Sequence, residues 1–227
     1  MKTALITGIS KGIGKALAQR YLQEGWNVLG TSTTGAVDFA DKNLKVFKLD
    51  LSSPESIKAC AKAIASSGLK IDVLHNNAGV LLDDEETRLI VDKLRLTLEV
   101  NLIGTIDFCE RIIPIINKDG HIVNTSSQAG SLTREDDDSA THFPHHYPAY
   151  KISKTALNMY TRTLSGRLMR EGTGIIVSSV HPGWVRTAIG GDEAPVSPEE
   201  AAEDLFKLAT SRPETGQFWF KGNKYPW

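Results

Sequence analysis

Short apolar runs alternate along the chain with longer stretches in which apolar residues recur at helical spacing. The short runs have the length and composition of buried strands and lie at residues 4–6, 26–31, 45–49, 71–75, 120–125, 174–180 and 217–220. Helices are predicted at residues 16–22, after a cap at Ser52 or Ser53, and at 94–116, 150–169 and 198–210. Strands that alternate with helices predict an α/β fold with a doubly wound parallel sheet and helices on both faces.

The predicted topology places polar and glycine-rich segments together at one edge of the sheet. Right-handed crossovers bring the carboxyl ends of parallel strands to the same edge, and ligands bind there in open α/β sheets. The sequence contains no linker, repeat or low-complexity tract, so residues 1–227 are predicted to form one domain.

A glycine-rich turn joins the first strand to the first helix. Gly8, Gly12 and Gly14 have the spacing Gly-x3-Gly-x-Gly, which differs from both G-x-G-x-x-G and the P-loop. A strand, a glycine turn and a helix in this order direct backbone N–H groups and a helix N-terminus toward a phosphate. The alternative is an ordinary strand-to-helix turn that requires glycine.

Composition and charge exclude several classes of protein. Hydrophobic residues make up 41% of the chain and charged residues 23%, and the formal net charge of −1 predicts no surface for nucleic acid. No apolar run reaches the roughly 18–20 residues of a membrane span. Cys60 and Cys109 are predicted to be free buried thiols. The first strand follows Met1 directly, which predicts no signal peptide and a cytoplasmic location.

Tyr150 and Lys154 are four residues apart and therefore share one face of a helix. A free phenol has a pKa near ~10, and a close ammonium group is expected to lower it toward the range of general acid–base catalysis. Ser127, after the strand at 120–125, is placed to hold a carbonyl oxygen beside that phenol. The alternative is a partly buried tyrosine with a surface lysine at helical spacing.

Several motifs occur together in one order along the chain. They are Thr7-Gly8-x3-Gly12-x-Gly14, Asp50-Leu51, Asn76-Asn77-Ala78-Gly79, Asn101, Ser127, Tyr150-x3-Lys154 and Pro182-Gly183-Trp184-Val185-Arg186-Thr187. In this order they resemble the short-chain dehydrogenase/reductase family, nearly from end to end. The segments Gly216-Gln217-Phe218 and Pro226-Trp227 are similar to its carbonyl-reductase and C-factor (sniffer-like) branch. The resemblance implies a single Rossmann-type NAD(P)-binding domain.

The resemblance also implies a role for individual residues. Tyr150 is expected to exchange a proton with the substrate oxygen, and Lys154 to lower its pKa and bind the nicotinamide ribose. Ser127 is expected to orient the carbonyl, and Asn101 to anchor a water that leads to Lys154. The implied cofactor-binding residues are Gly8, Ser10, Lys11, Gly12, Ile13, Gly14, Ser32, Thr33, Asp50, Leu51, Asn76, Asn77, Ala78, Gly79, Tyr150, Lys154, Pro182, Gly183, Val185 and Thr187.

The sequence favours NADP(H) over NAD(H). The second strand ends in Ser32-Thr33-Thr34 without the carboxylate that would bind a ribose 2′-hydroxyl and repel a 2′-phosphate. Lys11 adds a positive charge in the glycine turn, although the arginine that many NADP-using relatives carry near Thr33 is missing. We therefore expect Lys11, Ser32 and Thr33 to contact the 2′-phosphate.

The segment 128–149 separates Ser127 from Tyr150 by 23 residues, where the family often has about a dozen. It is expected to form part of the substrate rim, so substrate specificity does not transfer from the family. His142, His145 and His146 beside the acidic run 136–138 lack a rigid ligand spacing and are expected to be solvated, with no metal. His75 is expected to be a buried, non-catalytic histidine. Trp184 is predicted to line an apolar substrate pocket or to pack in the core.

The combined prediction is an NAD(P)H-dependent oxidoreductase that transfers hydride between the nicotinamide and a small carbonyl or alcohol substrate, with Tyr150 as general acid or base. The alternative is a cofactor-binding signalling protein of C-factor type that acts through a partner. A homodimer through the helices at 94–116 and 150–169 is also expected from the resemblance.

Overall fold

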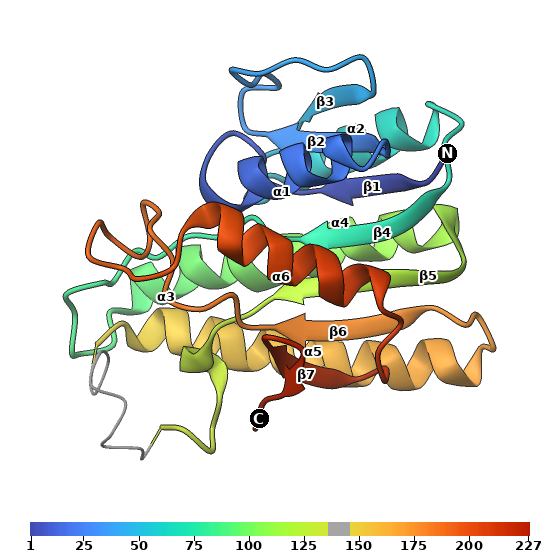
Figure 1. Cartoon of the computed structure of the whole chain (residues 1–227). Helices are drawn as coiled ribbons and strands as arrows, with labels where there is room; N and C mark the ends of the chain where they lie inside the picture. Colours follow the sequence, from blue (N-terminus) through green and yellow to red (C-terminus); the bar gives the residue numbers. More distant parts are fainter. Residues whose placement is uncertain (136–145) are drawn as a thin grey trace.

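The computed structural model describes residues 1–135 and 146–227 and contains one sheet in the order β3-β2-β1-β4-β5-β6-β7-β8 (Figure 1). Its strands are β1 (Thr3–Ile6), β2 (Asn27–Ser32), β3 (Leu44–Lys48), β4 (Ile71–Asn76), β5 (Ile116–Thr125), β6 (Ile176–Val180), β7 (Gln217–Phe220) and β8 (Asn223–Lys224). Strands β1 to β7 all run parallel, and β8 pairs antiparallel with β7. The predicted parallel sheet is confirmed, and β8 is an addition that the sequence pattern did not predict.

Helices cover both faces of this sheet. They are α1 (Gly12–Gln23), α2 (Pro54–Ala65), α3 (Val91–Leu98), α4 (Thr105–Ile112), α5 (Pro148–Arg170) and α6 (Pro198–Thr210). Figure 1 shows α1 and α6 on one face and α2, α4 and α5 on the other. The predicted doubly wound α/β fold is therefore confirmed.

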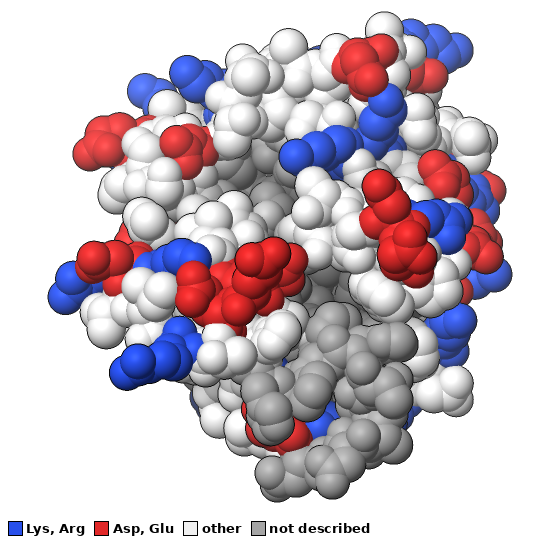
Figure 2. Space-filling view, turned by 90° about the vertical axis from the view of Figure 1, so that its left-hand side faces the viewer, with Lys and Arg blue, Asp and Glu red and all other residues white. Residues whose placement is uncertain are grey.

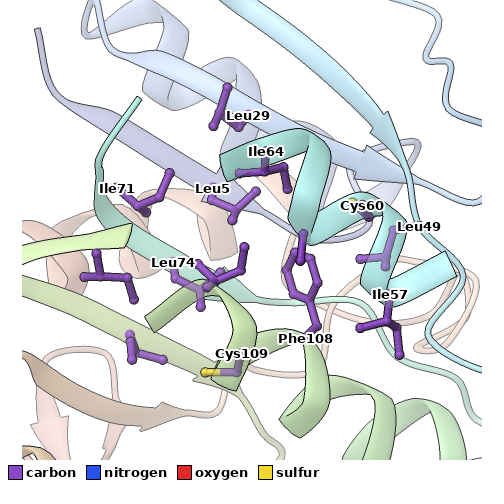
Figure 3. Close-up of a cluster of buried hydrophobic side chains, with 14 of the residues drawn as sticks. Leu5, Leu29, Leu49, Ile57, Cys60, Ile64, Ile71, Leu74, Phe108 and Cys109 are labelled. Atoms are coloured by element: carbon purple, nitrogen blue, oxygen red, sulfur yellow. The ribbon is translucent and has the colours of Figure 1, made fainter. Parts of the chain in front are cut away.

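Each face of the sheet has its own hydrophobic core, because successive residues of a strand point to opposite faces. Leu5 of β1 packs with Phe108 under the helical layer of α2, α4 and α5 (Figure 3). Its neighbours Ala4 and Ile6 belong to the core beneath α1 and α6. Cys60 and Cys109 are buried free thiols in the first of these cores, as predicted.

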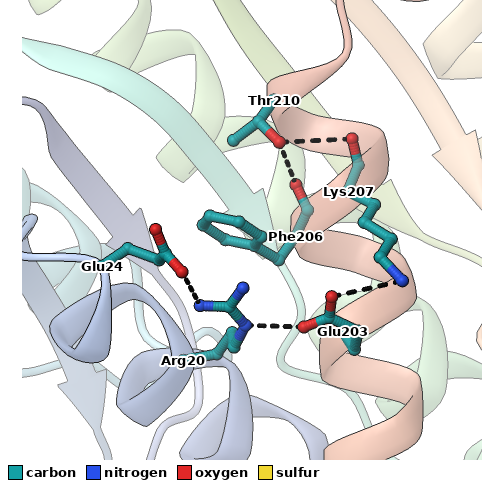
Figure 4. A network of polar contacts seen from close by, with 6 residues as sticks. All are labelled: Arg20, Glu24, Glu203, Phe206, Lys207 and Thr210. Carbon is teal, nitrogen blue, oxygen red and sulfur yellow. Dashed lines mark hydrogen bonds and ion pairs between the residues drawn. The ribbon is translucent and has the colours of Figure 1, made fainter.

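A polar network joins α1 to α6. Arg20 donates from Nε to Glu203 at 2.6 Å, pairs with Glu24, and lies 4.4 Å from the Phe206 ring centroid (Figure 4). Ion pairs this exposed contribute only about 0–1 kcal/mol each. The Arg20–Glu203 pair links α6 to the helix that follows the glycine turn.

The long helix predicted over residues 94–116 is present as a continuous helical stretch from Val91 to Ile115, but it is not α-helical throughout. α3 ends at Leu98, a π-helical segment follows at Glu99–Gly104, and α4 ends at Ile112 before a 3₁₀ turn, Ile113–Ile115, and the start of β5. At Gly104 a Cβ would lie 1.9 Å from the carbonyl oxygen of Leu51, so only glycine permits this close approach. Pro114 lies in the 3₁₀ turn, where its missing N–H cannot continue the helix.

Candidate active site

A cleft of about 810 Å³ opens at the carboxyl edge of the sheet. Figure 2 shows this face hollowed between acidic and basic side chains. The cleft is lined by the glycine turn and by the segments that follow β2, β3, β4, β5 and β6. It brings together every predicted site residue except Asn76 and Asn101, which lie behind its wall.

The glycine turn has the shape of a phosphate-binding cradle. Gly8 and Gly12 have φ angles of 75° and 57°, which other residues rarely adopt. At Gly14 a Cβ would lie 2.1 Å from the carbonyl oxygen of Gly8 and 2.6 Å from the Asn77 amide nitrogen. Among the described residues no side chain caps the N-terminus of α1, so its first N–H groups remain available to a phosphate. These features fit a nicotinamide dinucleotide.

The segment after β4 is tied to this turn. The Thr7 hydroxyl accepts hydrogen bonds from the backbone N–H groups of Asn77 (2.9 Å) and Ala78 (3.0 Å), and the Asn77 amide donates to the Thr7 carbonyl. Asn76 instead points into the protein, where its amide donates to Asn124 at 2.8 Å. The structure therefore places Asn77 to Gly79 at the cleft and Asn76 below it.

The end of β2 carries the residues predicted to recognise the 2′-phosphate. The Ser32 hydroxyl donates to the Ala36 carbonyl at 2.9 Å and accepts from the Gly35 N–H at 3.0 Å. Ser32 is buried, whereas Lys11 and Thr33 are exposed at the cleft. The Ser32 side chain thus shapes the turn, and Lys11 and Thr33 are better placed to meet a phosphate.

Asp50 lies at the adjacent end of β3. Its carboxylate accepts hydrogen bonds from the N–H and the hydroxyl of Ser52, at 2.9 and 2.6 Å, which hold its pKa below the usual value. The carboxylate therefore stays ionised near neutral pH and is available as an acceptor for an amino group.

Tyr150 and Lys154 lie on the cleft side of α5. The N-terminus of this helix is fixed by Asp83, whose buried carboxylate accepts from the Ala149 N–H at 2.6 Å. Lys154 donates from Nζ to the Thr125 carbonyl at 2.8 Å, and burial lowers the pKa of Lys154 to about 8. Its ammonium lies over the Tyr150 ring, 5.4 Å from the centroid.

Burial raises the pKa of Tyr150 to about 12, although a hydrogen bond with the Ser127 hydroxyl opposes the shift. The sequence predicted a lowered pKa. The difference arises because the Lys154 ammonium contacts the face of the ring and the Thr125 carbonyl, while loss of water around the phenol dominates. The phenol is therefore protonated near neutral pH and suited to donate a proton.

Ser127 is the serine that faces the phenol. Its hydroxyl oxygen accepts from the Ala129 N–H at 3.2 Å, at the start of the 3₁₀ turn Gln128–Gly130. Ser126 is buried, and its hydroxyl lies 3.4 Å from the Lys154 carbonyl. The geometry thus agrees with the choice of Ser127 over Ser126.

Asn101 lies in the π-helical segment, a feature that often marks functional sites. Its amide nitrogen donates to the Val80 carbonyl at 2.9 Å and to the Ser153 hydroxyl at 3.1 Å, and its amide oxygen accepts from the Val80 N–H. A Cβ at Gly79 would lie 3.1 Å from the Asn101 amide oxygen and 3.6 Å from the Lys154 ammonium. Asn101 and Lys154 therefore approach the same position beside Gly79.

The loop after β6 closes the cleft opposite α5. Gly183 has a φ of 94°, and its N–H donates to Nδ1 of His181 at 3.1 Å. The Thr187 methyl group lies 3.1 Å from the position of a Cβ at Gly12, so this loop reaches the glycine turn. Trp184 lines the cleft and donates from its indole to the Gly190 carbonyl.

Some lining residues were not predicted as site residues. They include Leu81, Leu82, Asp84, His181 and Ile189. His181 precedes Pro182 directly, which was the only available signal; the others follow strands at positions without a motif.

Two predictions about histidines have different outcomes. His75 is buried, its Nε2 lies 2.9 Å from the Tyr21 hydroxyl, and burial lowers its pKa to about 3, which agrees with a non-catalytic histidine. His142 and His145, with the acidic run 136–138, lie outside the described residues. Within residues 1–135 and 146–227, no group of three or more His, Cys, Asp or Glu is arranged to hold a metal ion.

The chain is similar along almost its whole length to known dehydrogenases and carbonyl reductases. The chain is 30% identical over 225 residues to 1-hydroxy-2-glutathionyl-2-methyl-3-butene dehydrogenase of Rhodococcus sp. (strain AD45), covering 96% of each. It is 28% identical to carbonyl reductase [NADPH] 1 of Mus musculus, covering 99% of this chain and 98% of that protein. NADPH-bound carbonyl reductase from chicken fatty liver superposes with a TM-score of 0.88 at 25% identity, covering 100% of this chain and 94% of the other.

The model of the short chain dehydrogenase family matches residues 2–196. This match covers the glycine turn, Asn101, Ser127, Tyr150 and Lys154, on which the resemblance was based, and confirms it. The chain therefore belongs to the short-chain dehydrogenase family of NAD(P)H-dependent oxidoreductases.

Proposed function

We propose that the protein reduces small carbonyl compounds with NADPH, with Tyr150 as the proton donor. The observation that carries this proposal is the meeting of the Ser127 hydroxyl and the protonated Tyr150 phenol on one wall of a cleft that also contains the glycine turn. The similarity to carbonyl reductase [NADPH] 1 supports the carbonyl group as the reacting function.

Ser127 and Tyr150 have separate roles in the proposed reaction. NADPH, when bound, supplies the hydride that reaches the carbonyl carbon. The Ser127 hydroxyl, whose oxygen is held by the Ala129 N–H, donates a hydrogen bond to the carbonyl oxygen. Tyr150 then gives its proton to that same oxygen as negative charge develops there.

Lys154 and Asn101 support this proton transfer without contacting the substrate oxygen. The Lys154 ammonium has one N–H engaged with Thr125 and two left, one for a ribose hydroxyl and one for a water. A water held between the Asn101 amide oxygen and Lys154 returns a proton toward the phenol after each turnover. Because both groups approach Gly79, a Cβ there would press against the Asn101 amide oxygen at 3.1 Å.

NADPH is the preferred cofactor in this proposal. Lys11 and Thr33 offer a charge and a hydroxyl at the exposed end of β2, where no carboxylate opposes a 2′-phosphate. The NADPH bound to the carbonyl reductase from chicken fatty liver supports the same choice.

A homodimer is part of the proposal. Leu96 and Ile103, on α3 and the π-helical segment, are 59% and 51% exposed, and Ile152 and Met159 of α5 are also exposed. Each pair is separated by about two helical turns, so each forms an apolar stripe suited to pack against a second copy. Size-exclusion chromatography with light scattering tests this; a monomer at micromolar concentration would contradict it.

Residues 1–227 are proposed to act as one domain on a small molecule in the cytoplasm. The net charge of −1 supports neither a nucleic-acid nor a membrane partner, and the two free thiols suit a reducing compartment. Among the helices described, none combines the length and apolar character of a membrane span.

The test is NADPH oxidation against a panel of aldehydes, ketones and quinones, with the wild type and Tyr150→Phe. We expect turnover by the wild type and a loss of at least about 1,000-fold in kcat in the variant. NADPH affinity, measured by fluorescence, should stay within twofold. Full activity of Tyr150→Phe would exclude the mechanism. A wild type that binds NADPH but reduces no substrate would favour the signalling alternative.

A further inference from the structure

The last residues of the chain contact the loop that carries Ser127. The Thr133 N–H and hydroxyl both donate to the main-chain oxygen of Trp227, at 2.8 and 2.7 Å, and the Ser131 hydroxyl donates to the Pro226 carbonyl at 2.9 Å. These partners are 94 and 95 residues apart in the sequence. We call residues 225–227 the tail clasp.

Aromatic rings anchor the tail clasp to the sheet. The Trp227 ring stacks on Phe218 of β7, with centroids 5.4 Å apart, and the Arg162 guanidinium of α5 lies 5.8 Å from the Trp227 ring. Phe218 is fully buried. The tail clasp is therefore fixed to rigid elements and not merely laid over the loop.

The same clasp reaches the loop after β6. The Tyr225 ring meets His181 edge-on at 5.2 Å, and His181 stacks on Phe220 at 4.2 Å. Nδ1 of His181 accepts the Gly183 N–H, at the left-handed turn that begins the predicted cofactor-binding loop at residues 182–187. Tyr225 thus touches one wall of the cleft while Pro226 and Trp227 hold the other.

The path from the clasp to Ser127 is short and hydrogen-bonded. The Ser131 N–H donates to the Gln128 carbonyl, the Gly130 N–H donates to the Ser127 carbonyl, and the Ala129 N–H donates to the Ser127 hydroxyl. The opposite side of this turn is held by α5, since the Asn158 amide donates to the Gly130 carbonyl at 3.0 Å. These hydrogen bonds connect residues 131–133 to the Ser127 hydroxyl.

We propose that Tyr225, Pro226 and Trp227 are positioning residues that fix the Ser127 hydroxyl relative to the loop at residues 181–187. This proposal rests on the proposed function, because Ser127 must orient the substrate carbonyl for the clasp to affect catalysis. Its distinct content is that the tail acts through Ser127 and leaves the phosphate-binding side of the cleft unchanged.

The test removes the two hydroxyl donors with the double variant Ser131→Ala/Thr133→Val and measures kcat/KM with a reducible carbonyl. We expect a loss of about tenfold, because the variant removes both hydroxyl donors to the tail clasp while the Thr133 N–H keeps its hydrogen bond. Dissociation of NADPH, measured by fluorescence, should stay within twofold, and hydrogen exchange at residues 128–133 should accelerate. Thr163→Val, which removes an exposed hydroxyl on α5, is the matched control.

A double-mutant cycle with Ser127→Ala separates positioning from general loss of structure. The double variant Ser131→Ala/Thr133→Val is called the clasp variant. We expect it to lower kcat/KM less than twofold when Ser127 is already alanine. Trp227→Ala should behave like the clasp variant, and Trp227→Phe, which keeps a stacking ring, should restore activity. Losses that simply add in the cycle, or a clasp variant as active as the wild type, would overturn the proposal. An inactive wild type would instead refute the proposed function.

Discussion

The ammonium of Lys154 lies 2.8 Å from the carbonyl oxygen of Thr125, at the end of the strand that leads to Ser127. This hydrogen bond links α5 to β5 and fixes the lysine beside the Tyr150 ring. It also keeps a positive charge in a buried position, where the lost hydration is costly. Two predictions arise from this arrangement, one for stability and one for cofactor binding.

Lys154→Met is expected to stabilise the folded protein at pH 7 while impairing activity. Burial lowers the pKa of Lys154 from 10.5 to about 8, so the folded state pays to keep the lysine charged. The variant removes that cost but leaves the Thr125 carbonyl without this donor, for a net gain of about 1–2 kcal/mol. Denaturant unfolding measures the change.

The sign of the pH dependence follows from the same shift. The unfolded chain binds more protons than the folded chain between pH 8 and 10.5, so Lys154 makes stability rise with pH in that window. The advantage of Lys154→Met should therefore be largest below pH 8 and fade toward pH 10.5. A variant less stable than the wild type at pH 7 would contradict the argument.

NADPH binding to the wild type is expected to weaken as the pH rises through about 8. The neutral amine offers weaker hydrogen bonds to ribose hydroxyls than the ammonium does, which corresponds to about a tenfold rise in Kd. Fluorescence titration from pH 6.5 to 9.5 measures it. Lys154→Met is the control and should show no such transition; an identical transition in both proteins would assign it to another group.

Ser127→Ala and Ser126→Ala separate the two adjacent serines. Ser127 faces the Tyr150 phenol, whereas the Ser126 hydroxyl is buried against the Lys154 carbonyl. Loss of a hydrogen-bond donor at the reacting oxygen should lower kcat by about 100-fold for Ser127→Ala. Ser126→Ala should stay within threefold. Steady-state kinetics at saturating NADPH provides the comparison, and equal effects would refute the assignment.

Lys11→Ala is expected to raise the Kd of NADPH about tenfold and to leave the Kd of NADH nearly unchanged, since only NADPH carries the 2′-phosphate. Ser32→Ala should affect both cofactors alike, because the Ser32 hydroxyl is bonded within its own turn. Parallel titrations with the two cofactors measure these effects. An unchanged NADPH affinity in Lys11→Ala would remove Lys11 from the phosphate site.

The features that sequence reasoning found are local ones. The four-residue spacing of Tyr150 and Lys154 fixes a shared helical face, and the spacing of Gly8, Gly12 and Gly14 follows from the turn itself. The high pKa of Tyr150 was missed because burial is a tertiary property and outweighs a neighbouring charge. The contact of Thr133 with Trp227 joins distant segments, so no periodicity reports it.

The π-helical segment within the helix predicted over 94–116 illustrates the same limit. Its apolar periodicity is continuous, but the close approach of the Leu51 carbonyl to Gly104 belongs to the packing of the π-helical segment against the loop after β3. A single glycine in a helical pattern does not reveal such an approach. Asn101 was found by its motif, while the π-helical segment that presents it was not.

Two helical glycines should respond in opposite ways to substitution by alanine. At Gly14 a Cβ would lie 2.1 Å from the Gly8 carbonyl oxygen, so Gly14→Ala must displace the backbone of the glycine turn. We expect a loss of about 2–4 kcal/mol in unfolding free energy and a large loss of NADPH affinity. At Gly166, in α5, the nearest atom to a Cβ outside the helix backbone is the flexible end of Arg170, at 3.5 Å.

Gly166→Ala is therefore the matched control and should stabilise the protein by about 0.5–1 kcal/mol, because alanine loses less backbone entropy in a helix. Urea unfolding followed by circular dichroism measures both variants, and fluorescence titration measures their NADPH affinity. If Gly14→Ala proved as stable as the wild type and bound NADPH equally well, the close contact between α1 and the turn would not be required for the phosphate cradle.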